Sequence, residues 1–228
     1  MTSTVAQARV LGWLRAASAG RKAHPRRPRE REWPDLSKVQ YFTACTLDGF
    51  IADENNSLDW LFEVPHEADD GYWDSWFPGV GALVMGATTY EWMIERYGLA
   101  DSTERWRDFY GDRPGWVFTH RRLPLIPHVD VRLVEGAVRP VYTDIAAAVG
   151  DANIWVLGGG DLVGQFYDAN LLHEIILGMT PVTLGRGAPL LPRRITSKNL
   201  TFRSAELIGQ RVRIVLETSA GAGRPPVG

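Results

Sequence analysis

Residues 153–169, NIWVLGGGDLVGQFYDA, combine a short apolar run, three consecutive glycines and a segment with helical character. Residues 153–157 have the length and composition of a buried strand. A helix is expected over residues 161–169, so Gly158, Gly159 and Gly160 join the strand to the helix. A buried strand that leads directly into a helix is typical of α/β proteins with a mainly parallel sheet.

The same alternation continues on both sides of this stretch. Strands are expected at 39–46, 82–85, 116–119, 129–134 and 173–180, and a short extension of the first strand at 50–52. Helices are expected at 67–77, 88–97 and 142–149, and residues 101–112 are expected to form a further helical turn or a lid. Loops are expected at 53–61 and 184–191, and the last strands, 201–207 and 211–218, form a hairpin about Gly209.

These elements predict an α/β fold with three layers. A mainly parallel central sheet is covered by helices on both faces, and the C-terminal hairpin gives it an antiparallel edge. In such sheets ligands bind beyond the carboxyl ends of the strands. The search for a functional site therefore starts where strands end and helices begin.

The composition narrows the class of protein. The chain has 228 residues, of which 45% are hydrophobic and 23% charged, and its formal net charge is −2. No whole-chain field therefore attracts nucleic acid. A single cysteine excludes an intramolecular disulfide framework and a cysteine-rich zinc site, the histidines show no metal-ligand spacing, and no apolar run reaches the roughly 18 residues of a membrane span. A cytoplasmic protein without a metal is expected.

The basic residues are concentrated at the N-terminus. Residues 1–38 contain nine lysines and arginines against three acidic residues, a net charge of +6, which leaves −8 for residues 39–228. This segment has few apolar groups to bury, so it is expected to be a disordered extension. A contact with nucleic acid or a membrane is the alternative. The folded domain is expected over 39–218, and residues 219–228 form a flexible tail.

Two strand-to-helix junctions are candidates for binding phosphate groups. Gly158, Gly159 and Gly160 allow close approach of a ligand to the backbone, and the free N–H groups of a helix start favour anions. Gly86 lies at a second junction, followed by Thr88 and Thr89. A tight turn without a ligand is the alternative for the three glycines, and simple helix capping is the alternative for the threonines.

A third strand ends in a cationic segment. Thr119, His120, Arg121 and Arg122 follow one another there, and arginine binds a phosphate monoester through two N–H groups. A solvated turn is the alternative. Taken together, two helix starts and one cationic strand end describe a dinucleotide site better than any of them does alone.

Carboxylates supply the candidates for acid–base chemistry. Asp48 follows Thr46 at the end of the first strand, and Asp70 lies on the acidic helix expected at 67–77. A buried carboxylate with a raised pKa can act as a general acid. Stabilisation of a turn is the alternative for Asp48, and a solvated helix face is the alternative for Asp70. The signatures of serine hydrolases, Walker-type nucleotide sites and zinc proteases are absent from the sequence.

In combination, these motifs resemble the dihydrofolate reductase superfamily. The resemblance rests on Asp-Gly after the first strand, Met-Gly-x-x-Thr-Tyr at 85–90, and the triple glycine at 158–160. The segment TPVTLGRGAPL at 180–190 narrows it to the RibD C-terminal domain family of riboflavin biosynthesis. The resemblance covers residues 39–218 and implies the dihydrofolate reductase fold, a homodimer, and NADPH as cofactor.

The resemblance also implies roles for the cofactor-site residues. Pyrophosphate contacts are implied for Gly159, Gly160 and Thr89, with Gly86 allowing close approach, and 2′-phosphate contacts for His120 and Arg121. The full set of implied cofactor residues is Gly86, Thr88, Thr89, Thr119, His120, Arg121, Gly158, Gly159, Gly160, Asp161 and Leu162. One departure is Ala87, where dihydrofolate reductases often carry arginine.

The sequence contains fewer motifs that indicate the substrate site than motifs that indicate the cofactor site. Asp70 precedes Met85 by fifteen residues, as the pteridine-binding carboxylate does in bacterial dihydrofolate reductases. By this analogy, Asp48 and Asp70 anchor the substrate or relay a proton. Trp60 and Trp73 are expected as walls of the substrate site, together with Thr46. Riboflavin-pathway reductases have a lysine where this chain has Phe42, which weakens the case for a phosphoribosyl substrate.

The sequence therefore predicts an NADPH-dependent reductase. Hydride is expected to go to a pyrimidine- or pteridine-like heterocycle, as in a 5-amino-6-(5-phosphoribosylamino)uracil reductase of riboflavin biosynthesis. The expected partners are a small-molecule substrate and a second copy of the chain, with no membrane and, apart from the basic N-terminus, no nucleic acid. The alternative is a non-catalytic module of the same fold that binds a nucleotide or heterocycle without turnover; Ala87 and Phe42 favour it.

Overall fold

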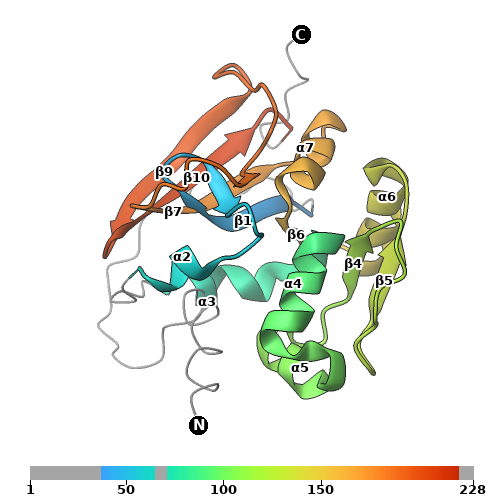
Figure 1. The fold of residues 1–228 in the computed structure, drawn as a ribbon. Coiled ribbons are helices and arrows are strands. Elements are labelled where there is room, and N and C mark those ends of the chain that lie inside the picture. The colour runs from blue at the N-terminus through green and yellow to red at the C-terminus, as the bar shows by residue number, and fades with distance from the viewer. Residues whose placement is uncertain (1–36, 65–70, 221–228) are drawn as a thin grey trace.

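A computed structural model describes residues 37–64 and 71–220 of the chain (Figure 1). Residues 1–36, 65–70 and 221–228 lie outside the described residues. Most of the predicted N-terminal extension, Asp70 and most of the C-terminal tail are among them, and the expectations for these segments stay predictions.

The centre of the fold is an eight-stranded sheet with the order β5-β4-β3-β6-β1-β7-β10-β9. Its strands are β1 (Val39–Thr46), β3 (Val80–Gly86), β4 (Gly115–Phe118), β5 (Val131–Val134), β6 (Asn153–Gly158), β7 (Glu174–Thr180), β9 (Leu200–Ile208) and β10 (Arg211–Thr218). All pairings from β5 to β7 are parallel, whereas β10 is antiparallel to both β7 and β9. The predicted parallel sheet with an antiparallel C-terminal hairpin is confirmed.

Two short strands form a second, small sheet. Its strands β2 (Phe50–Ala52) and β8 (Ala188–Pro189) pair antiparallel. The sequence predicts a loop at 184–191, whereas the structure contains the two-residue strand β8 there. No local pattern indicates this strand, because its partner lies more than a hundred residues earlier in the chain.

The described residues form six α-helices and two short 3-10 helices, Phe77–Gly79 and Leu99–Asp101. The α-helices are α2 (Asp59–Phe62), α3 (Tyr72–Trp76), α4 (Ala87–Tyr97), α5 (Thr103–Tyr110), α6 (Val138–Val149) and α7 (Gly160–Asp168). Helix α6 begins four residues before the predicted start, and its first turn contains Pro140. Proline is tolerated there because the first N–H groups of a helix have no partner within it. None of the described helices combines the length and hydrophobicity needed to cross a bilayer.

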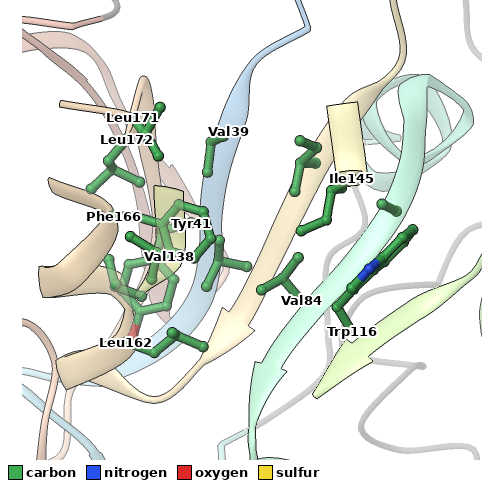
Figure 2. Packing of buried hydrophobic residues seen from close by; sticks show 14 of the residues in the cluster. Val39, Tyr41, Val84, Trp116, Val138, Ile145, Leu162, Phe166, Leu171 and Leu172 are labelled. Carbon is green, nitrogen blue, oxygen red and sulfur yellow. The ribbon is translucent and has the colours of Figure 1, made fainter. Parts of the chain in front are cut away.

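The helices cover both faces of the sheet and enclose two separate cores. One core packs α6 and α7 against the sheet through Ile145, Phe166 and Tyr41 (Figure 2). The other packs α3, α4 and α5 against the opposite face, with Tyr90 and Trp106 among its fully buried side chains. Strand β3 serves both cores, because successive side chains of a strand point to opposite faces. The three-layer prediction is thereby confirmed.

Candidate functional site

A cavity of about 580 Å³ lies at the carboxyl ends of the parallel strands. Its lining comes from β1, β2 and β8, from β3, β4, β5 and β6 at or near their carboxyl ends, and from residues of α2, α4, α5 and α7. This volume is within the range of small-molecule sites. The position agrees with the rule that ligands of parallel sheets bind beyond the carboxyl ends of the strands.

Two helices begin side by side at this cavity. Met85 pairs with Gly158 across the neighbouring strands β3 and β6, and α4 and α7 start two residues later on each strand. The two helices then run to opposite faces of the sheet, so a crevice opens between them. A Cβ added to Gly86 would lie 3.8 Å from the Gly159 nitrogen, which shows how closely the two starts approach.

Neither helix start is capped by a side chain. The N-cap residues are Gly86 for α4 and Gly159 for α7, and glycine has no side chain to accept the first N–H groups. These N–H groups are left for a ligand, and the positive end of each helix dipole favours an anion. Two such starts facing one cavity can hold two linked phosphate groups.

The glycines of the junction between β6 and α7 differ in the space around them. A Cβ on Gly160 would lie 2.2 Å from the carbonyl oxygen of Pro189, so this position admits no side chain. Around Gly159, in contrast, a Cβ would meet nothing within 4 Å. The peptide bond between Gly158 and Gly159 is cis. Gly160 therefore allows a loop to pack on the helix start, whereas Gly159 leaves open space in the cavity.

The remaining residues predicted at the helix starts also line the cavity. These are Thr88, Thr89, Asp161 and Leu162. The Thr89 hydroxyl oxygen would lie 3.1 Å from a Cβ on Gly158, so the two junctions touch through this side chain as well. Asp161 accepts hydrogen bonds from Gln165 and Arg193, and these lower the pKa of its carboxyl group. The structure thus brings together all the glycines and threonines predicted for the pyrophosphate.

The cationic strand end is only partly at the cavity. Thr119 and His120 line it, and the His120 Nδ1 lies 3.7 Å from a carboxylate oxygen of Glu135. Arg121 does not line it, because its guanidinium donates two hydrogen bonds, of 2.9 and 2.7 Å, to the Glu91 carboxylate. Arg122 is exposed nearby. Contact of Arg121 with the cofactor therefore requires this exposed ion pair to open.

Asp48 does not have the setting of a buried acid. Its carboxylate accepts a hydrogen bond from Thr46 and two more from the backbone N–H groups of Leu184 and Gly185, and these bonds lower its pKa. The side chain is exposed, and neither Asp48 nor Thr46 lines the cavity. The prediction of an acid with a raised pKa is corrected: Asp48 anchors the loop that begins at Leu184.

The tryptophans predicted as walls are not part of the lining. Trp60 and Trp73 are 6% exposed, and both belong to the core rather than to the cavity surface. The Trp73 ring lies 6.0 Å from that of Phe42, which does line the cavity, so Trp73 supports the wall from behind. Asp70, the second carboxylate, lies outside the described residues and stays a prediction.

Sequence reasoning missed the aromatic part of the lining. This part is formed by Phe42, Trp92, Met93, Tyr97, Tyr110 and Trp155. Met93 and Tyr97 are four residues apart on α4, a spacing that signals one helix face but does not distinguish a core from a cavity wall. Within the described residues, no group of three histidine, cysteine, aspartate or glutamate side chains is placed to hold a metal ion.

Comparison with known sequences gives a consistent family match. The model of the RibD C-terminal domain family matches residues 99–214. The uncharacterized protein YwjB of Bacillus subtilis is 30% identical over 177 residues, which cover 78% of this chain and 95% of that protein. A second uncharacterized protein of the same organism, YyaP, is 23% identical over 170 residues, covering 71% of this chain and 85% of that protein.

Solved structures share the fold. A protein of Shewanella sp. PV-4, assigned by its name to riboflavin biosynthesis, superposes with a TM-score of 0.64 at 26% identity, covering 79% of this chain and 98% of that one. The Thermotoga maritima diaminohydroxyphosphoribosylaminopyrimidine deaminase/5-amino-6-(5-phosphoribosylamino)uracil reductase gives a TM-score of 0.57 at 16% identity. The match covers 80% of this chain but only 57% of that longer protein, and at this identity it supports the fold alone.

Proposed function

Because the chain belongs to the RibD C-terminal domain family, we propose that it is an NADPH-dependent reductase that transfers hydride to a pyrimidine- or pteridine-like heterocycle. The observation that carries this proposal is the convergence of two uncapped helix starts on one cavity. The cavity continues from there along α4 to the aromatic part of its lining.

The residues at the helix starts fit a dinucleotide. The pyrophosphate would be held by backbone N–H groups at the beginnings of α4 and α7, with Thr88 and Thr89 as further donors. Gly159 leaves the room that such a group needs, because a Cβ there would meet no other atom within 4 Å. Charge supports the assignment, since the positive ends of both helices face the same space.

The 2′-phosphate that distinguishes NADPH from NADH needs a cation. His120 lines the cavity beyond the end of β4, and Arg121 and Arg122 follow it on the surface. In the proposed complex the phosphate competes with Glu91 for the Arg121 guanidinium. Such exposed ion pairs contribute about 0–1 kcal/mol, so a bound phosphate can replace Glu91 at little cost.

The cofactor and the protein have different roles in the proposed reduction. The hydride is supplied by NADPH when it is bound. The chain holds the two reactants next to each other in this part of the cavity, whose wall includes the aromatic side chains of Phe42, Trp92 and Trp155. The described lining has no carboxylate among these aromatic residues, so we propose that water delivers the proton.

Binding of the cofactor tests the proposal directly. Trp92 and Trp155 line the cavity, so NADPH bound there should quench tryptophan emission in a saturable way. The double variant Arg121→Ala/Arg122→Ala should lose roughly tenfold in affinity for NADPH and little for NADH, because charge-assisted hydrogen bonds to the 2′-phosphate are removed. Titrations of both nucleotides against both proteins give the four dissociation constants.

The control removes two positive charges elsewhere. Arg107→Ala/Lys198→Ala changes the net charge equally, and neither residue lines the cavity. This variant should bind NADPH as the wild type does. Absence of saturable NADPH binding at millimolar concentration contradicts the proposal, and equal loss of NADPH affinity in both double variants contradicts the assignment of the 2′-phosphate to Arg121 and Arg122.

A non-catalytic binding module is the second candidate. It is favoured by the lack of a carboxylate in the aromatic part of the described lining and by Ala87 at the start of α4, where related enzymes often have arginine. The two candidates differ in turnover. A reductase oxidises bound NADPH when a suitable heterocycle is added, whereas a binding module holds both ligands unchanged.

A further inference from the structure

The cavity continues from the two helix starts toward the ends of β4 and β5. These strands are the next two in the sheet beyond β3 (Figure 1). Neighbouring strands lie about 4.8 Å apart, so β5 lies about 10 Å across the sheet from β3. Because the aromatic part of the lining is assigned to the reacting ring, a nucleotide with its pyrophosphate at the helix starts has its adenosine ribose near the ends of β4 and β5.

Glu135 and His120 lie side by side at these two strand ends. Phe118 pairs with Val134 across β4 and β5, and the Thr119 N–H donates a hydrogen bond of 2.9 Å to the Val134 carbonyl oxygen. Just beyond this hydrogen bond, the His120 Nδ1 lies 3.7 Å from a carboxylate oxygen of Glu135. Both side chains belong to residues that line the cavity.

The lining at this end contains a carboxylate but neither lysine nor arginine. Among the described residues of the lining, the ionisable side chains other than tyrosine are those of His120, Glu135 and Asp161. The Asp161 carboxylate, at the start of α7, is paired with the Arg193 guanidinium at 3.0 Å. Glu135, in contrast, has only the His120 imidazole within ion-pair distance among the described residues. Its negative charge is therefore less well compensated than that of Asp161.

The arginines that follow His120 do not compensate the Glu135 charge. The Arg121 guanidinium donates both of its hydrogen bonds to Glu91, and Arg122 is exposed. Neither arginine lines the cavity, and Glu91 does not line it either. A ribose at the ends of β4 and β5 therefore meets the Glu135 carboxylate inside the cavity, whereas the two arginines lie outside its lining.

A carboxylate distinguishes the two nicotinamide nucleotides at the 2′ position of this ribose. It only accepts hydrogen bonds, so it can bind the 2′-hydroxyl of NADH, which donates one. The 2′-phosphate of NADPH carries negative charge and is repelled by a carboxylate at close range. In Rossmann folds an acidic side chain at the ribose accordingly accompanies NAD, and an arginine accompanies NADP. In this chain both kinds of side chain lie at the same strand ends.

We propose that Glu135 is a specificity-determining residue that limits the preference for NADPH. Its carboxylate accepts a hydrogen bond from the ribose 2′-hydroxyl of NADH and opposes the 2′-phosphate of NADPH, so that the chain binds both nucleotides. This inference rests on the proposed function, because it requires the adenosine ribose to lie at the ends of β4 and β5. The effect of Glu135 is opposite in sign to that of Arg121 and Arg122.

Glu135→Gln tests this role, because it removes the charge and keeps the size of the side chain. Without the repulsion, affinity for NADPH should rise about fivefold. Affinity for NADH should fall about twofold, because an amide oxygen is a weaker acceptor than a carboxylate. The ratio of the two dissociation constants thus moves about tenfold toward NADPH. Titrations of the full chain, followed by tryptophan emission, give the ratio, and an unchanged ratio overturns the inference.

Two other glutamates provide matched variants. Glu95→Gln removes an exposed charge from α4, outside the lining, and should leave the ratio unchanged. Glu91→Gln releases the Arg121 guanidinium and should strengthen binding of NADPH alone. A shift in Glu95→Gln as large as that in Glu135→Gln overturns the inference.

Salt provides a readout that a merely structural role of Glu135 would not change. The side chains of His120 and Glu135 are 85% and 69% exposed, so their charges are screened at high ionic strength. The gain in NADPH affinity from Glu135→Gln should therefore largely disappear at about 1 M salt. A gain that is undiminished there overturns the inference, because it does not arise from removal of the charge.

Adenosine 2′,5′-bisphosphate and AMP separate this inference from the proposed function. They differ from each other by the same 2′-phosphate but have no nicotinamide ring. A ratio for these two ligands that shifts in Glu135→Gln, without any binding of NADPH, retains the role of Glu135 and contradicts the reductase. Binding of NADPH with a ratio that Glu135→Gln leaves unchanged retains the cofactor site and contradicts the inference. Absence of binding for all four nucleotides overturns both.

Discussion

At the scale of single residues, Gly86, the N-cap of α4, and Gly160, the first residue of α7, differ in whether they tolerate a side chain. A Cβ on Gly160 meets the Pro189 carbonyl oxygen at 2.2 Å, whereas one on Gly86 has its nearest contact at 3.8 Å. Gly160→Ala should therefore lower the free energy of unfolding by about 1–3 kcal/mol through overpacking. Gly86→Ala should stay within about 1 kcal/mol of the wild type but bind NADPH about tenfold more weakly, because its methyl group enters the pyrophosphate site.

Chemical denaturation and nucleotide titration of the two variants check this pair. The difference between the two variants tests the assignment more directly than the stability or the NADPH affinity of either variant alone. Equal destabilisation by both substitutions, or unchanged NADPH affinity in Gly86→Ala, would show that the two helix starts do not have the roles assigned to them.

Because of His173, the free energy of unfolding should depend on pH. Its Nδ1 accepts a hydrogen bond of 3.0 Å from the Val39 N–H, which requires the neutral ring. Burial, followed by the charge of Lys38, lowers the pKa of His173 in the folded protein. Below about pH 6.5 the unfolded chain binds this proton more readily than the folded one, so stability falls as the pH decreases.

Denaturation at about pH 7.5 and about pH 5.5 measures this effect. The wild type should lose more stability between the two values than His173→Asn, which keeps an acceptor atom but does not titrate. His128→Asn, at an exposed position, should behave as the wild type. A wild type and a His173→Asn variant with the same pH dependence would refute the assignment.

The surroundings of a residue could be predicted when its contacts are with residues nearby in the sequence, and not when they are with distant ones. Gly86, Thr89 and Gly159 lie at strand-to-helix junctions as predicted, because such a junction is a local pattern that a few neighbouring residues define. The surroundings of Asp48 and Trp73 could not be predicted in this way. Asp48 is bonded to backbone groups 136 and 137 residues later in the chain, and no local pattern reports such a contact.

At the scale of elements, the loop from Leu184 to Arg193 is held at both ends. Asp48 binds its beginning, and Arg193 at its end pairs with Asp161 and Asp168 on α7. In between, the Leu190 N–H donates to the Gly49 carbonyl. The loop packs on the start of α7, so its order should affect the cofactor site.

Arg193→Ala should loosen this loop without unfolding the protein. Its partners are more than half exposed, so the cost in stability should stay at or below about 1 kcal/mol. Hydrogen exchange of residues 184–193 should become faster, and NADPH should bind a few-fold more weakly. Arg107→Ala, which breaks an exposed pair with Asp112, should change neither quantity. Unaltered exchange in Arg193→Ala would mean that the loop is held by its backbone contacts alone.

Strand β1 and helix α6 show which element ends a sequence pattern can predict. Strand β1 was predicted with its observed ends, because eight residues of alternating character bounded by a turn define a strand locally. The start of α6 was missed by four residues, since Pro140 resembles a helix breaker but lies in the first turn, where it is harmless.

At the scale of the whole molecule, no other described part of the chain covers the apolar edge of the sheet at β9. Strand β9 is the last strand of the sheet, and its Phe202 and Leu207 are 70% and 76% exposed. They pair with Leu216 and Val212 of β10. Exposed apolar groups on an unpaired edge strand mark an interaction surface. We propose that this edge forms the homodimer predicted from the family resemblance.

Light scattering coupled to gel filtration tests the dimer. The wild type should elute with twice the mass of one chain, and Phe202→Lys/Leu207→Lys should elute as a monomer of unchanged fold. Leu125→Lys replaces another exposed leucine, between β4 and β5, and should remain dimeric. A monomeric wild type, or a dimeric double variant, would place the proposal in error.

The central claim is that NADPH binds where α4 and α7 begin. Hydrogen exchange measured by mass spectrometry, with and without saturating NADPH, locates the bound cofactor on the whole chain. We predict slower exchange at the first turns of α4 and α7, at residues 119–122 after β4, and in the loop 184–193 that packs on α7. Exchange that NADPH leaves unchanged at both helix starts, or protection only elsewhere in the chain, would contradict the claim.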